Sequence, residues 1–146
     1  MSIAVWKTEY LTGHSQVDQE HQQLFEIVNS LHDAILQEES YSVLQKIFNH
    51  LATHTIEHFE SEEALMLAKA YPGFHRHKQV HDGLLAKVNA LLQQLDQQEL
   101  PPSVKLTEFL TEWLAHHIKG EDQKMIQFFR QQAEFEPVVP LTSSTL

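Results

Sequence analysis

The sequence predicts an all-α protein folded as an up-down-up-down four-helix bundle, with an irregular N-terminal arm and a short C-terminal helix and tail. Apolar residues recur at alternating spacings of three and four over most of the 146 residues, which is the period of a helix with one buried face. The chain contains only 4 Gly and 5 Pro, and strand-like alternation is scarce. Amphipathic helices joined by short connections favour the antiparallel topology.

The first helix follows an irregular arm. Residues 1–17 show no clear period, and Trp6 can cover the edge of a core. Asp18 is predicted as the N-cap of a helix from about 18 to 38. Its expected inward residues are Leu24, Phe25, Val28, Leu31 and Ile35.

Two long helices should form the middle of the chain. The second is expected to begin after an N-cap at Ser40 or Ser42 and to end near Ala68. A Tyr-Pro-Gly break separates it from the third, which is expected from about Phe74 to about Leu95. Both carry a regular apolar stripe.

The fourth helix is expected from about Ser103, after a break at Pro101 and Pro102. Gly120 weakens it, and a last amphipathic piece runs to about Gln132. The inward residues of this region include Leu106, Leu110, Trp113 and Leu114.

Seven polar residues interrupt these apolar stripes. They are His21, His58, Glu62, His77, His81, His117 and Asp122. Each lies near the same end of an antiparallel bundle, so all seven should meet at one level. Burying even an uncharged polar group without a partner costs roughly 2–7 kcal/mol, and a carboxylate costs more. A positive partner must therefore face Glu62, and the pattern indicates a metal.

Five imidazoles and two carboxylates exceed the four ligands of a structural zinc. They suit two ions bridged by Glu62 and Asp122, and nitrogen and oxygen ligands without sulfur fit iron, manganese or zinc, with iron favoured. A chance set of buried polar groups in a structural bundle is the plain alternative. A ferritin-like site would use more carboxylates and a Glu-x-x-His pair on two helices, which is absent from the inward faces.

The spacing of the last two ligands predicts a local distortion. Asp122 follows His117 by five residues, and five residues turn a regular helix by about 500°, about 140° beyond one full turn. A π-type turn, helped by Gly120, would align positions five apart. We therefore expect the helix to kink, widen or break between His117 and Asp122.

Composition narrows the function. The formal charge of −10 argues against nucleic acid as a partner. No apolar run reaches the length of about 18 residues that a membrane span needs. The N-terminal residues lack a secretory pattern, and without cysteine there is no disulfide framework and no thiolate site. We expect a cytoplasmic protein.

Several motifs resemble those of a known family. Trp6, Gly13, VDQEH ending at His21, HFESEE, YPGFHRHKQVH and WLAHHIKGED resemble the single-domain bacterial hemerythrins, from Trp6 to about Phe129. The resemblance implies a hemerythrin-like bundle at 1–133, including the arm 1–17, and a tail at 134–146. It implies two non-haem irons with an oxo or hydroxo bridge. One iron takes His77, His81 and His117, the other takes His21 and His58, and Glu62 and Asp122 bridge them.

The resemblance implies reversible dioxygen binding by a carrier, store or supplier rather than by an enzyme. The expected protein is a monomer, and its partners are dioxygen and, as a candidate, a protein that consumes oxygen. The alternatives are a di-iron enzyme that reduces peroxide or nitric oxide, with weak peroxidase-type activity, and an oxygen- or iron-sensing module. The expected oxygen pocket comprises Leu24, Phe25, Phe59, Trp113, Leu114 and Ile118. His54, one turn before His58, either contacts a ligand or simply lies at the helix boundary.

Overall fold

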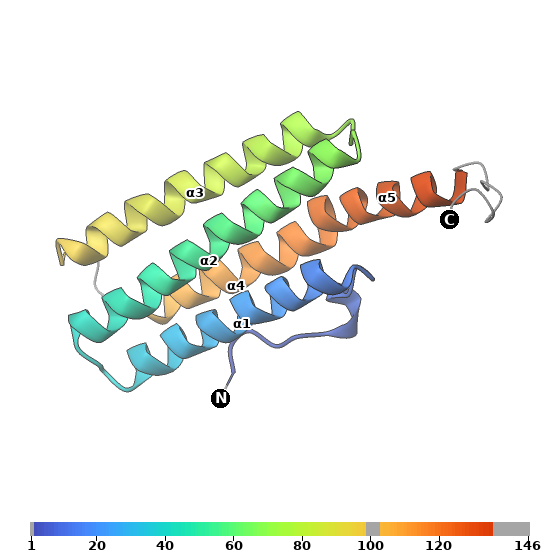
Figure 1. The fold of residues 1–146 in the computed structure, drawn as a ribbon. Helices are drawn as coiled ribbons and strands as arrows, with labels where there is room; N and C mark the ends of the chain where they lie inside the picture. Colours follow the sequence, from blue (N-terminus) through green and yellow to red (C-terminus); the bar gives the residue numbers. More distant parts are fainter. Residues whose placement is uncertain (1, 99–102, 136–146) are drawn as a thin grey trace.

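The computed structural model describes residues 2–98 and 103–135. Its elements are η1 (Thr8–Tyr10), α1 (Ser15–Leu36), α2 (Tyr41–Ala68), α3 (Phe74–Asp96), α4 (Val104–His117), η2 (Ile118–Asp122) and α5 (Gln123–Phe135). Helices α1 to α4 lie side by side as the predicted antiparallel bundle, and α5 continues the line of α4 beyond its end (Figure 1). The predicted break at Pro101 and Pro102 and residues 136–146 of the predicted tail lie outside the described residues.

The predicted start of the first helix is wrong by one turn. Helix α1 begins at Ser15 because Nδ1 of His14 accepts the backbone N–H of Val17 at 3.3 Å and so caps it. The second helix does begin after one of its two predicted caps: Ser40 Oγ accepts the N–H of Val43 at 3.3 Å. A side-chain acceptor at either position satisfies an N–H that the helix itself leaves free.

Asp18 holds the N-terminal arm instead of capping the helix. It is buried inside α1, and its carboxylate accepts the N–H of Thr12 at 2.8 Å and of Gly13 at 3.1 Å. Gly13 has φ +92°, and the guanidinium of Arg130, which donates to the Thr12 carbonyl, fills the space where a Cβ would lie. The turn therefore requires glycine and joins the arm to both α1 and α5.

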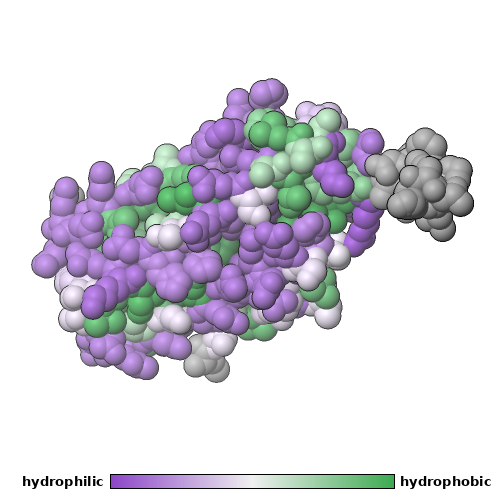
Figure 2. Space-filling view, viewed as in Figure 1, coloured by the Kyte–Doolittle hydropathy of each residue, from purple (hydrophilic) through white to green (hydrophobic). Residues whose placement is uncertain are grey.

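The apolar core has two parts. A large cluster fills most of the bundle, from Leu24 in α1 to Ile118 in η2. A small one, which we call the end cluster, consists of Val17, Met66, Met125 and Ile126. Each end-cluster residue lies about one helical turn beyond His21, Glu62 or Asp122. A layer of polar side chains, which we call the polar layer, therefore separates the two clusters. Hydrophilic residues cover most of the face in Figure 2, and no helix in the described residues is long and apolar enough to cross a membrane.

Histidine also occurs inside the large cluster. His32 is buried, and its Nδ1 lies 2.9 Å from the Thr107 hydroxyl, which itself donates to the carbonyl of Val104. His32 is therefore a hydrogen-bonded core residue. The contact joins α1 to α4 away from the polar layer.

Candidate metal centre

The seven predicted side chains meet in the polar layer. Their ligand atoms form two groups, within each of which all atoms lie within 4.8 Å of one another. We call them the trio, His77, His81 and His117, and the pair, His21 and His58; Glu62 and Asp122 belong to both groups. None of the seven is more than 4% exposed. Five helical segments contribute, as the antiparallel topology predicted.

A π-type turn brings the last ligand into place. Residues Ile118–Asp122 form this turn between α4 and α5, so His117 and Asp122 point to the same side although they are five residues apart. The predicted distortion is confirmed. A Cβ at Gly120 would meet open space, so close packing does not require glycine at that position.

Each carboxylate divides its oxygens between the two groups. Glu62 Oε2 lies 2.9 Å from His58 Nε2, and Oε1 lies 3.0 Å from His81 Nε2. Asp122 Oδ2 lies 2.8 Å from His21 Nε2, and Oδ1 lies 3.0 Å from His77 Nε2. This is the arrangement that two shared, bridging ligands require.

The buried atoms at the centre fit a metal better than they fit one another. Within the described residues, Nε2 of His21, His58, His81 and His117, both oxygens of Glu62 and Asp122 Oδ2 make no hydrogen bond. Their close approaches are thus charge contacts without hydrogen-bond alignment. Buried polar atoms are normally hydrogen-bonded, and each exception needs an explanation. Lone pairs that converge on one point are explained by a cation there.

Without a metal, the imidazoles balance the carboxylates. Burial lowers the pKa of His58, but the charge of Glu62 and the hydrogen bond to Glu20 outweigh burial and raise that pKa to about 10. Burial likewise opposes protonation of His77, yet Asp122 and Glu62 raise its pKa to about 9. Burial raises the pKa of Glu62, but the facing histidines, led by His58, hold it well below its ordinary value.

These shifts predict how the metal-free protein responds to pH. A raised pKa means that the folded state binds the proton more tightly, so the stabilisation is complete below the ordinary histidine pKa of 6.5 and is lost as pH rises through about 9 to 10. We expect the urea midpoint of the metal-free protein to fall between pH 6.5 and 9.5. The metal-loaded protein, whose ligand nitrogens carry no proton, is the control. A midpoint that rises over this range in the metal-free protein would contradict the assignment.

Two acidic residues near the ligands were missed by the sequence analysis. Glu20 Oε1 lies 2.6 Å from His58 Nδ1, and Glu63 Oε2 lies 2.9 Å from His81 Nδ1. Both residues lie inside the motifs that carry the family resemblance, directly beside His21 and Glu62. That adjacency was the available signal, but a position 100° from an inward residue is ordinarily assigned to the surface.

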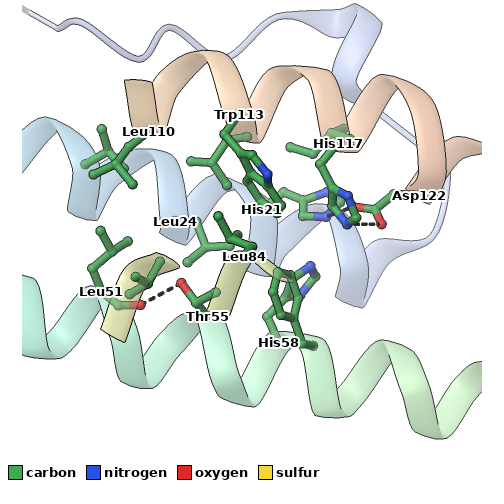
Figure 3. A pocket seen from close by; sticks show the side chains of 15 residues that line it. His21, Leu24, Leu51, Thr55, His58, Leu84, Leu110, Trp113, His117 and Asp122 are labelled. Carbon is green, nitrogen blue, oxygen red and sulfur yellow. Dashed lines mark hydrogen bonds and ion pairs between the residues drawn. The ribbon is translucent and has the colours of Figure 1, made fainter. Parts of the chain in front are cut away.

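An apolar cavity adjoins the polar layer. Leu24, Phe59, Trp113, Leu114 and Ile118 line it, together with Val28, Leu51, Thr55, Leu84, Val88 and Leu110. About 20 Å³ is open to the centre of a water-sized molecule, which is room for a very small ligand. Figure 3 shows the histidines and Asp122 at one end of the cavity and Leu51 and Leu110 at the other.

Two predicted neighbours of the centre lie elsewhere. Phe25 is 100° around α1 from Leu24, and its ring packs against Trp6 and Tyr10 at centroid distances of 5.2 and 5.4 Å. It therefore does not line the cavity. His54 is half-buried and stacks on His50 with centroids 4.9 Å apart, while its neighbour Thr55 faces the cavity.

The comparisons with known proteins agree with this geometry. The family model described as the hemerythrin HHE cation binding domain matches residues 12–129. The bacteriohemerythrin of Stenotrophomonas maltophilia is 31% identical over 123 residues, covering 84% of this chain and 79% of the relative. That of Methylococcus capsulatus is 31% identical over 124 residues, covering 84% and 94%. A crystal structure of wild-type hemerythrin superposes with a TM-score of 0.79 at 29% identity, covering 84% of this chain and 94% of that one.

Proposed function

Because the chain belongs to the hemerythrin family, we propose that it binds dioxygen reversibly at a pair of non-haem irons, as an oxygen carrier, store or supplier. The observation that carries the proposal is the division of Glu62 and Asp122 between the trio and the pair. We assign the bundle domain to residues 1–133 and the tail to 134–146.

In this proposal the trio holds one iron, the pair holds the other, and the two carboxylates bridge them, with a solvent-derived oxo or hydroxo group as a further bridge. The bound irons supply the redox chemistry by which dioxygen is held and released. The pair offers one histidine fewer than the trio, so an iron held there would have room for a small ligand.

The cavity supports placing dioxygen beside the pair. Both histidines of the pair, His21 and His58, line it, whereas of the trio only His117 does. Its remaining walls are almost entirely apolar, so they admit a small apolar molecule and exclude water. The one hydroxyl among them, that of Thr55, donates to the Leu51 carbonyl at 2.7 Å and is not free to donate elsewhere.

The same wall weighs against the enzyme alternative. Reduction of peroxide or nitric oxide needs proton delivery, and a positioned acid or base typically contributes about 10²–10⁴-fold. Apart from the metal-site residues, the cavity offers only aliphatic and aromatic side chains and the engaged hydroxyl of Thr55. A wall of this kind favours release of the oxygen unchanged.

Reversibility tests the proposal directly. The iron-loaded protein is reduced under anaerobic conditions, exposed to air, and returned to an oxygen-free atmosphere while its visible spectrum is recorded. We expect the spectrum to change in air and to return when oxygen is removed, over repeated cycles. An irreversible change on first exposure, or rapid turnover with peroxide and a reductant, would favour the enzyme alternative.

A further inference from the structure

Two of the five histidines, His58 and His81, contact a carboxylate through the ring nitrogen that faces away from the centre. Their Nε2 atoms face the centre, while Nδ1 of His58 meets Glu20 and Nδ1 of His81 meets Glu63, at 2.6 and 2.9 Å. The two imidazole side chains are 2% and 0% exposed, whereas those of Glu20 and Glu63 are 23% and 18% exposed. Each carboxylate therefore stays partly hydrated while its partner ring is fully enclosed.

The distribution of these contacts is selective. His58 belongs to the pair and His81 to the trio, so each proposed metal position has one histidine with a carboxylate partner. Within the described residues, Nδ1 of His21, His77 and His117 makes no hydrogen bond. The two proposed metal positions are thus alike in having one carboxylate-supported histidine each, although one has two histidines and the other three.

The chemistry of such a contact is well defined. A neutral imidazole carries one N–H and one lone pair, and a carboxylate at Nδ1 selects the tautomer that has its lone pair on Nε2. The ring orientation is fixed at the same time, and the negative charge makes Nε2 a stronger donor to a metal. When a metal displaces the proton on Nε2, the ring is already oriented with that atom towards the centre.

The two carboxylates are themselves held in place. Gln16 Nε2 donates to Glu20 Oε2 at 3.1 Å and to Ser61 Oγ at 3.2 Å, which ties α1 to α2. Lys78 Nζ lies 3.8 Å from Glu63 Oε1, the oxygen that does not meet His81. Glu20 reaches from α1 to α2, and Glu63 reaches from α2 to α3, so both contacts cross a helix interface.

We propose that Glu20 and Glu63 are positioning residues for the metal centre, each setting the tautomer and orientation of one ligand histidine and slowing the loss of the ion that it binds. The inference rests on the proposed function, because it assumes that iron occupies the trio and the pair. It adds two residues that contact neither iron nor oxygen.

Leucine and glutamine variants separate orientation from charge. Glu20→Leu and Glu63→Leu remove the acceptor, and we expect them to release iron to a ferrous chelator about 10–100-fold faster than the unmodified protein. Glu20→Gln and Glu63→Gln keep an oxygen that can accept the N–H, so their release should be slowed back towards the unmodified rate. Glu60→Leu is the matched control. Glu60 is an exposed glutamate in α2, the helix that also carries Glu63, and its replacement removes the same charge.

A second readout reports the tautomer itself. In the cobalt(II)-loaded protein, proton NMR resolves exchangeable ligand N–H signals. Each leucine variant should move or remove one such signal, a different one for Glu20 than for Glu63, and leave the others in place. Both glutamine variants should also raise the reduction potential of the iron centre relative to Glu60→Gln, since a lost negative charge favours the ferrous state.

The possible results distinguish a failure of the positioning role of Glu20 and Glu63 from a failure of the proposed function. If the leucine variants release iron at the rate of Glu60→Leu and keep every N–H signal, the inference is overturned while the proposed function stands. If the unmodified protein binds no iron, the proposed function itself fails. Should a leucine variant not fold, as judged by circular dichroism, unchanged reduction potentials in the two glutamine variants would overturn the inference alone.

Discussion

Replacing Glu62 by alanine is expected to reduce the iron content from about two ions per chain to below one. Glu62 is fully buried, and its two oxygens face the pair and the trio. Its loss removes a ligand from both positions at once. Residues that merely support a ligand already change metal affinity about 10–100-fold, so iron affinity should fall by more than about 100-fold.

Iron analysis after anaerobic reconstitution with ferrous iron measures this effect. Glu60→Ala, an exposed glutamate in the same helix, is the control and should retain about two ions per chain. Glu62→Gln separates the lost charge from the lost volume and should also bind poorly, because an amide is a weak bridging ligand. A Glu62→Ala protein that still holds two irons would refute the bridging assignment.

Replacing Leu114 by glutamate is expected to shorten the life of the oxygenated protein by about 10²–10⁴-fold. Leu114 is 7% exposed and lines the cavity beside His21 and His58. A carboxyl group buried there takes up a proton readily, since burial disfavours its charged form. The oxygen site would then have the proton source that the native wall withholds.

The rate at which the oxygenated spectrum decays in air measures the change. Leu114→Met keeps the volume and the apolar character and should decay at nearly the native rate. His54→Phe is a second control: His54 stacks on His50 and does not line the cavity, so its replacement should have no effect. Slow decay in Leu114→Glu would show that the apolar wall is not what protects the oxygenated protein.

Much of this architecture follows from helical period alone. The stripes predicted the helices and their inward faces, and antiparallel order then brought His21 to the level of His58 and Glu62. Even the π-type turn was predictable, because a regular helix cannot align two residues that are five apart. These features depend only on spacing along the chain and on the order of the helices.

The parts that were missed depend on neighbours outside the helix concerned. Phe25 is inward by period, but the arm supplies Trp6 and Tyr10 to cover it on another side. Asp18 looks like a cap until the preceding turn places Thr12 against its carboxylate. Glu20 was likewise not singled out, because its partner His58 belongs to the next helix. Helical spacing predicts the direction in which a side chain projects from its own helix, but not which residues of other segments lie in that direction.

The separation of the two apolar clusters affects how the protein unfolds. The end cluster is small, and the polar layer isolates it from the large cluster, so apolar burial is not continuous along the bundle. In the metal-free protein the end that carries Met66 and Met125 can open locally while the remainder stays folded. Such opening gives an ion access to ligands that are otherwise enclosed. A bound metal would tie ligands from α1 to η2 to one another and so oppose this local opening.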